Sequence, residues 1–130
     1  MEDKHDEIIE EIKVAIIKTN KARIWKNFNY SLYTNGEIYQ IDLVVLIDFN
    51  LIIFEIKTGI KEKKARKQLE FHKKAFIEAQ SKIKPIKNIQ FSKIQIFWVT
   101  YEDEKIVNLE TNEEMKYINF INDPLSFLKH

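Results

Sequence analysis

The sequence predicts an α/β domain in which helices flank one central mixed sheet. Ile38–Ile47 and Leu51–Ile56 are rich in β-branched residues, and only the hairpin-length segment Asp48-Phe49-Asn50 separates them. Residues 62–81 then repeat apolar side chains at helical spacing, which predicts a helix after the hairpin. A single sheet covered by helices would bury all of these apolar faces.

The N-terminal segment predicts a helix and then a strand. From about Asp3 to Thr19, apolar side chains fall on one helical stripe, formed by Ile8, Ile9, Ile12, Ala15 and Ile16. Ala22–Leu32 contains aromatic and β-branched residues and predicts the first strand, which ends near the turn signal Asn35-Gly36.

The segment after the hairpin predicts a second helix and a fourth strand. After Thr58-Gly59, a helix from about Glu62 to Ser81 carries the apolar stripe Ala65, Leu69, His72, Phe76 and Ala79. Pro85 marks the end of this helix or the loop that follows it. Lys93–Tyr101 alternates in the manner of a strand.

The C-terminal tail predicts short elements. Ile106–Leu109 and Tyr117–Phe120 are interpreted as short strands, and Asn122-Asp123-Pro124 is typical of a cap that opens a last helical turn. We therefore expect residues 1–130 to form one domain, with a core at about residues 5–101 and a small C-terminal appendage at about residues 102–130.

Charge and composition limit the possible functions. The 21 Lys and Arg residues nearly balance the 20 Asp and Glu residues, so the net charge of +1 gives no overall attraction to polyanions. The absence of cysteine excludes disulfides and thiol chemistry and fits a reducing cytoplasm. The charged N-terminus lacks the apolar segment of a secretory signal, and the apolar runs are too short to span a bilayer. We expect a cytoplasmic protein that does not bind membranes.

Three charged residues interrupt the otherwise apolar hairpin. Glu55 and Lys57 are two residues apart and therefore share a face of their strand, and Asp42 interrupts the preceding strand. If Phe49-Asn50 forms the turn, Asp42 faces Lys57; if Asp48-Phe49 forms it, Asp42 faces Glu55. Either register places all three side chains on one face.

This arrangement favours a metal site. Buried charges are costly unless they are paired, hydrated or bound to metal. Two adjacent carboxylates, here Asp42 and Glu55, are oxygen ligands that Mg²⁺ or Mn²⁺ prefers, and a nearby lysine can orient or deprotonate a water. The alternative is an ordinary cross-strand ion pair, which does not account for Asp42 in register with Glu55 among apolar residues.

These residues resemble the core of the PD-(D/E)xK nuclease superfamily. The resemblance rests on Asp42, its spacing to Glu55, the run Ile53–Gly59 and the predicted order of elements, and it covers roughly residues 5–101. It is greatest to the NERD-type and small Holliday-junction-resolvase-like branches, although Ile41 stands where many members have proline. It implies a restriction-endonuclease-like αβββαβ core and a divalent-metal phosphodiesterase, with Asp42 and Glu55 as ligands and Lys57 acting on the attacking water.

The resemblance also implies further site residues. Members often take another carboxylate from the first helix, for which Glu11 is the better candidate and Glu7 the alternative. They often place a glutamine on the second helix, which suggests that Gln68 contacts a metal-bound water or a phosphate. We interpret His5 as a core or helix-start residue and His72 as a hydrogen-bonded core residue.

Basic residues near the predicted site are candidates for binding phosphates. The basic candidates lie at the start of the second helix and are Lys61, Lys63, Lys64 and Arg66. Gln40, which shares the face of Asp42, is a further candidate for contact with the nucleic acid. The alternative is that these cations form a solvated helix face. Trp25 and Trp98 are interpreted as core or interface residues.

The sequence leaves the biological role open between two classes; a third, a purely structural protein, is less favoured because it leaves the register of Asp42, Glu55 and Lys57 unexplained. The first is a metal-dependent nuclease, acting on DNA in preference to RNA, with structure-selective or low sequence specificity. The second is a non-catalytic nucleic-acid-binding or scaffold subunit on the same fold in a defence, repair or mobile-element complex. Either could form a homodimer or a larger complex, with Phe71 and residues 117–127 as possible contacts.

Overall fold

The computed structural model describes residues 4–19, 21–32, 36–57 and 62–128 and contains one six-stranded mixed sheet. The strands lie side by side in chain order: β1 (Arg23–Tyr30), β2 (Tyr39–Ile47), β3 (Asn50–Lys57), β4 (Lys93–Thr100), β5 (Lys105–Asn108) and β6 (Glu114–Lys116). β3 and β4 pair in parallel, and the other neighbours pair antiparallel. The predicted α/β class with a mixed sheet is confirmed.

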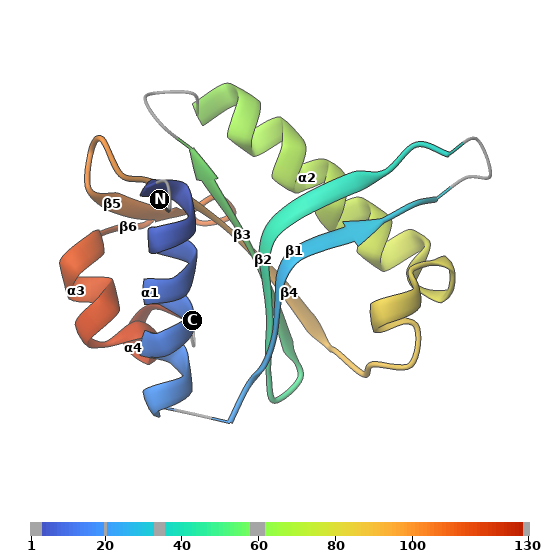
Figure 1. The fold of residues 1–130 in the computed structure, drawn as a ribbon, viewed down its shortest axis with the longest axis horizontal. Coiled ribbons are helices and arrows are strands. Elements are labelled where there is room, and N and C mark those ends of the chain that lie inside the picture. The colour runs from blue at the N-terminus through green and yellow to red at the C-terminus, as the bar shows by residue number, and fades with distance from the viewer. Residues whose placement is uncertain (1–3, 20, 33–35, 58–61, 129–130) are drawn as a thin grey trace.

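Helices cover both faces of this sheet (Figure 1). The helices are α1 (Lys4–Thr19), α2 (Glu62–Glu78), α3 (Tyr117–Asn122) and α4 (Pro124–Leu128), with two short 3-10 turns, η1 (Gln80–Lys82) and η2 (Lys84–Ile86), after α2. α2 is the parallel crossover between β3 and β4, whereas α1, α3 and α4 lie together on the opposite side. Across the described residues, no helix has the length and apolar character needed to cross a membrane.

The sheet separates two apolar cores. Leu69 and Phe76 of α2 pack with Ile53 and Trp98 on one face. On the other face, Ile12 of α1 packs with aromatic residues of the sheet and of the C-terminal helices, namely Phe54, Phe97, Phe120 and Phe127. Burial of each such side chain contributes about 1.5–3 kcal/mol, so both cores hold the sheet in place between the helices.

The β2–β3 hairpin has one of the two predicted registers. Leu43 pairs with Phe54, and Asp48 adopts a left-handed φ of 54° in the turn. Such a conformation is tolerated by aspartate better than by most residues. The register with Asp48-Phe49 as the turn is thus the observed one, and its continuation places Asp42 opposite Glu55.

The β1–β2 ribbon bends where Asp42 lies. Asn27 has a φ of 50° and lies between the pairs formed by Lys26 with Leu43 and by Phe28 with Ile41. Beyond this point the ribbon turns away from β3 and extends along α2 (Figure 1). The bend opens the sheet between β2 and β3 at Asp42, which makes room for a cleft.

The C-terminal segment differs from the prediction in one element. Tyr117–Phe120, predicted as a strand, lies in α3, because Tyr117, Phe120 and Ile121 have the spacing of one helical face and pack against the core beneath α1. The strand predicted at Ile106–Leu109 corresponds to β5, and α4 begins at Pro124 as predicted. β5 and β6 extend the central sheet.

Candidate functional site

Asp42, Glu55 and Lys57 converge at the end of the β2–β3 ladder. The backbone N–H of Asp42 donates to Glu55 Oε1 over 3.4 Å, and Lys57 Nζ lies 3.5 Å from Glu55 Oε2. The backbone N–H of Ile56 donates to Asp42 Oδ2 over 2.8 Å. The two carboxylates and the ammonium therefore lie together at this end of the hairpin.

Glu55 is the buried member of this group. Its side chain is only 6% exposed, whereas that of Lys57 is 24% exposed. Burial, and then the negative charge of Asp42, raise the pKa of Glu55 from 4.5 to about 7, and Lys57 opposes this shift. A divalent cation beside Glu55 would favour the ionised carboxylate, because it would offset both causes of the raised pKa.

His5 reaches the site from the first turn of α1. Its Nε2 lies 3.0 Å from Asp42 Oδ2, and the side chain is 33% exposed. We expected a core or helix-start residue, and the structure adds this contact with the candidate ligand. The sequence carried a signal for it, because His5 continues the stripe that holds Ile8, Ile12 and Ile16.

Gln68 approaches the same space from α2. Its Oε1 atom is buried and accepts no hydrogen bond from the described residues. An unsatisfied buried acceptor is costly and calls for a donor. The side chain lines the cleft that contains Asp42 and Glu55, so a water or another donor in this cleft would satisfy it.

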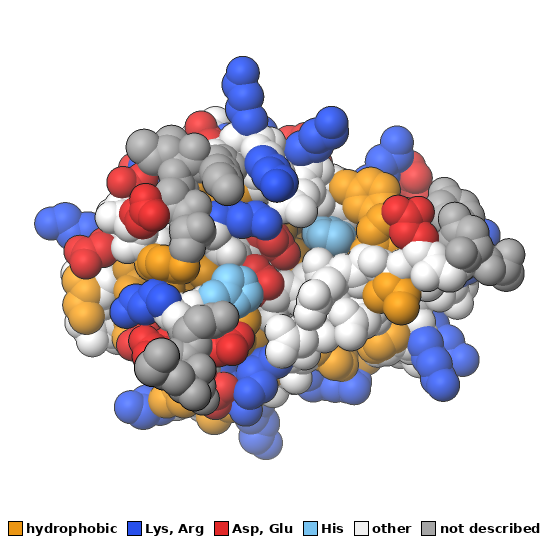
Figure 2. All heavy atoms as spheres, turned by 45° about the horizontal axis from the view of Figure 1, so that its top comes forward, with side chains coloured by type: hydrophobic (Ala, Val, Ile, Leu, Met, Phe, Trp, Pro, Cys, Tyr) orange, Lys and Arg blue, Asp and Glu red, His pale blue; other side chains and the backbone are white. Residues whose placement is uncertain are grey.

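Asp42, Glu55, Lys57 and Gln68 line a cleft of about 610 Å³, here called the Asp42 cleft. Its polar part is formed by Gln40, Asp42, Glu55, Lys57, Lys67 and Gln68. Figure 2 shows acidic side chains in this hollow between two histidines, with cations along its upper rim and apolar groups to the right. The volume falls within the range of ordinary ligand sites.

The rest of the cleft is apolar and aromatic. Ile38, Tyr39, Phe71 and His72 complete its lining. The rings of Tyr39 and Phe71 lie 4.9 Å apart, and Phe71 and Ile38 are 42% and 69% exposed. The Asp42 cleft therefore has two parts: a polar half, which contains Asp42, Glu55 and Lys57, and an aromatic half, which contains Tyr39, Phe71 and His72.

His72 is held in its neutral form beside this cleft. Its Nδ1 lies 2.6 Å from the hydroxyl of Tyr30, and burial, followed by the charge of Lys57, lowers its pKa to about 4. The predicted hydrogen-bonded core histidine is confirmed, and the residue also lines the Asp42 cleft.

The first-helix carboxylates do not join the site. Glu11 Oε1 accepts a hydrogen bond from the Tyr117 hydroxyl over 3.0 Å and lines a different hollow. Glu7 is exposed and lies 3.8 Å from Lys4. The interpretation of Glu11 as a metal ligand is contradicted by this geometry, because its helix position faces α3 and not β2.

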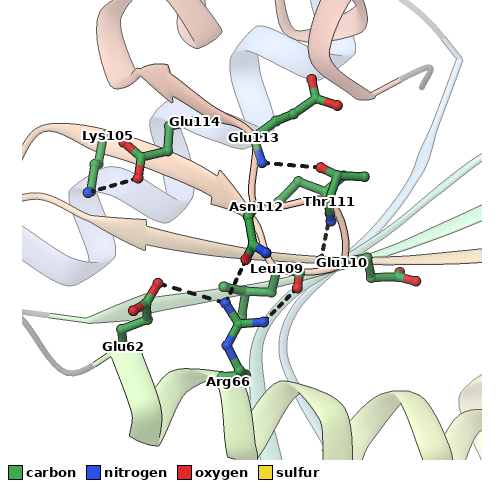
Figure 3. A network of polar contacts seen from close by, with 10 residues as sticks. Glu62, Arg66, Lys105, Leu109, Glu110, Thr111, Asn112, Glu113 and Glu114 are labelled. Carbon is green, nitrogen blue, oxygen red and sulfur yellow. Dashed lines mark hydrogen bonds and ion pairs between the residues drawn. The ribbon is translucent and has the colours of Figure 1, made fainter.

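Arg66 is also engaged elsewhere. Its guanidinium donates to the backbone oxygen of Leu109 over 2.7 Å and to Asn112 Oδ1 over 2.8 Å, and it lies 3.7 Å from Glu62 (Figure 3). These contacts fasten α2 to the turn after β5. The geometry therefore assigns Arg66 to this structural network and not to the cleft, where we had expected a phosphate contact.

The other predicted phosphate-binding residues are placed variously. Lys63 and Lys64 are exposed on α2, and Gln40 is exposed and lines the cleft. Lys61 lies outside the described residues. Lys67 of the same basic run lines the cleft although the sequence did not single it out.

The donor set suits a cation held by few protein ligands. Among the described residues, no three or more His, Cys, Asp or Glu side chains form a group arranged to hold a metal ion. Asp42 and Glu55 supply two carboxylates, and His5 instead contacts Asp42. Mg²⁺ in enzymes is commonly held by one or two carboxylates, with waters and substrate phosphates completing the octahedron. The buried acceptor of Gln68 fits such a hydrated ion.

Comparisons with known proteins add little. No family model and no curated protein matches the sequence. A crystal structure described as "Protein of Unknown Function AF1548" is similar with a TM-score of 0.39 and 17% identity over 72% of this chain and 47% of the other. The chain thus spans about half the length of that protein.

Proposed function

We propose that this protein is a divalent-metal-dependent nuclease that hydrolyses phosphodiester bonds, with DNA as the first substrate to test. The observation that carries the proposal is the convergence of Asp42, Glu55 and Lys57 in one cleft. The order α1-β1-β2-β3-α2-β4 and the resemblance of these residues to the PD-(D/E)xK superfamily support the same conclusion.

Two carboxylates hold the cation in this proposal. Asp42 and Glu55 would bind Mg²⁺ or Mn²⁺, which would supply Lewis-acid stabilisation of the charge that develops on the phosphate. The Ile56 N–H and His5 both contact Asp42 Oδ2, so they orient this carboxylate before the cation binds. The charge of the ion would compensate for the burial of the Glu55 carboxylate.

Lys57 and Gln68 act on the water in the same proposal. Lys57, 3.5 Å from Glu55 Oε2, would orient the attacking water or stabilise negative charge on the phosphate. The buried Oε1 of Gln68 can accept a hydrogen bond from that water. Lys67, exposed at the cleft, can bind a neighbouring phosphate.

The test is cleavage by the purified protein. Supercoiled plasmid, single strands and four-way junctions are incubated with Mg²⁺, Mn²⁺ or EDTA. We expect metal-dependent cleavage that Asp42→Ala and Lys57→Ala each reduce by at least about a hundredfold, whereas Lys105→Ala, which removes an exposed ion pair with Glu114, leaves it unchanged.

Two results would contradict the proposal. Cleavage that survives both site substitutions would come from another site or from a contaminant. If no substrate is cut but nucleic acid is still bound, the protein would be the non-catalytic binding module.

A further inference from the structure

The aromatic half of the Asp42 cleft has no part in the hydrolysis described above. Phe71 is 42% exposed on α2, although a phenyl ring gains from burial. It lines the same cleft as Asp42 and Glu55. With Ile38, which is 69% exposed, the ring gives this cleft an apolar wall beside its charged groups, a combination found in ligand sites.

The position of this ring is fixed by its neighbours. The centre of the Phe71 ring lies 4.9 Å from that of Tyr39 and 5.8 Å from that of His72. The ring centres of Tyr39 and Tyr30 are 5.3 Å apart. The hydroxyl of Tyr30 in turn contacts His72. Residues from β1, β2 and α2 thus hold the Phe71 ring in place before a ligand arrives, so little conformational entropy is lost on binding.

The charges of the cleft indicate what the ligand carries. Lys57 and Lys67 line it together with the two carboxylates, and Lys63 and Lys64 are exposed on the same helix. A nucleotide unit of a polynucleotide combines a phosphate for the cations with a flat ring for Phe71. Proteins that bind single strands combine these two features, a basic groove and aromatic rings on which bases stack.

We infer that Phe71, supported by Tyr39, stacks on an unpaired nucleobase next to the phosphate that the cation at Asp42 and Glu55 would hold, so that the substrate is single-stranded or locally unpaired nucleic acid. The inference rests on the proposed function, because it assumes that a phosphodiester occupies the polar half. Bases of an intact duplex are stacked on one another and cannot reach a ring inside the cleft.

The test is equilibrium binding, measured by fluorescence anisotropy in Ca²⁺, with a labelled single strand and a blunt duplex. Phe71→Ala should weaken single-strand binding roughly 5- to 100-fold, Phe71→Trp should retain it, and duplex binding should be unchanged. Phe49→Ala is the matched control. Phe49 is also an exposed phenylalanine, at 59%, but it lies in the turn before β3, at the opposite end of this strand from Glu55 and Lys57. This variant should bind like the wild type.

Three results would overturn the inference. The first is wild-type affinity of Phe71→Ala for the single strand. The second is an equal loss for strand and duplex, and the third is conversion of a dimer to a monomer by Phe71→Ala, which would make the ring a contact between two copies of the chain. Because binding is measured without cleavage, a protein that stacks bases but never cuts would retain this inference and lose the proposed activity. A protein that cuts but binds normally without the Phe71 ring would do the reverse.

Discussion

The carboxylate of Asp42 accepts the backbone N–H of Ile56 over 2.8 Å, in the strand that carries Glu55 and Lys57. Because β2 bends away from β3 at this point, the Asp42 side chain takes the place that a strand carbonyl would have in a continued ladder. The main chain of β3 thereby fixes the Asp42 carboxylate relative to Glu55 and Lys57, which flank Ile56. The candidate ligands are positioned by the hairpin itself.

Substitutions of Asp42 should separate this structural contact from the proposed chemistry. Asp42→Asn keeps an oxygen acceptor for Ile56, so its free energy of unfolding should stay near that of the wild type. Asp42→Ala leaves that partly buried N–H unsatisfied and should cost about 1–3 kcal/mol. Urea denaturation measures both, and equal stability of the two variants would contradict the structural contact.

Glu55 should make stability depend on pH. The folded protein retains the Glu55 proton up to about pH 7, whereas an ordinary carboxyl loses it near 4.5. The folded state therefore binds more protons in this window, and the contribution of Glu55 to stability is lost as the pH rises through it. As the pH rises from 4.5 to 7, the free energy of unfolding of Glu55→Gln should increase by on the order of 3 kcal/mol relative to that of the wild type. Denaturation in EDTA measures this difference.

His72 also makes stability depend on pH, but its effect is the same in the wild type and in Glu55→Gln. His72 is neutral when folded, with a pKa of about 4, so it makes stability rise with pH between about 4 and 6.5. This contribution is common to both proteins and cancels in their difference. A difference that stays constant with pH would show that Glu55 titrates normally.

Tyr30 and His72 should be energetically coupled. Tyr30→Phe removes the hydroxyl 2.6 Å from His72 Nδ1 and should destabilise the protein by about 1–3 kcal/mol, because it leaves a buried ring nitrogen without its partner. A double-mutant cycle with His72→Leu isolates the pair. A coupling free energy near zero would mean that the contact does not stabilise the fold.

Arg66 and Lys67 should have different roles although they are adjacent in sequence. Arg66→Ala should lower the midpoint of thermal unfolding, because it loses bonds to Leu109 and Asn112, and should leave the salt dependence of nucleic-acid binding unchanged. Lys67→Ala, at the cleft, should leave stability unchanged and reduce the salt slope of binding by about one. The reverse pattern would exchange these assignments.

Much of the fold could be predicted because local patterns and tertiary packing agree. The apolar stripe of α2 and the continuous apolar run of β3 each permit one efficient burial. The hairpin register was reduced to two possibilities, and the turn at Asp48 decides between them. The prediction of a strand at Tyr117–Phe120 was wrong. Such a short, largely apolar pattern fits a strand and a helix equally well, and only packing beneath α1 distinguishes them.

The geometry of the candidate site could be predicted where its residues are close in sequence and not where they are distant. Asp42, Glu55 and Lys57 share one hairpin, so register alone brings them together. The contributions of α1 depend on how this helix rotates over the sheet, and that rotation brings His5 and not Glu11 to Asp42. The aromatic half of the cleft depends on the bend at Asn27, which no local sequence pattern indicated.

Titration of Mn²⁺ into the wild-type protein and into Asp42→Asn and Glu55→Gln, followed by calorimetry, tests the central claim most directly. We expect one Mn²⁺ site, weakened roughly tenfold or more by either substitution. Affinity should also fall about tenfold between pH 8 and pH 6, because Glu55, with a pKa of about 7, must lose its proton to bind the ion. Mn²⁺ binding that is equal in all three proteins, or absent from the wild type, would contradict the account.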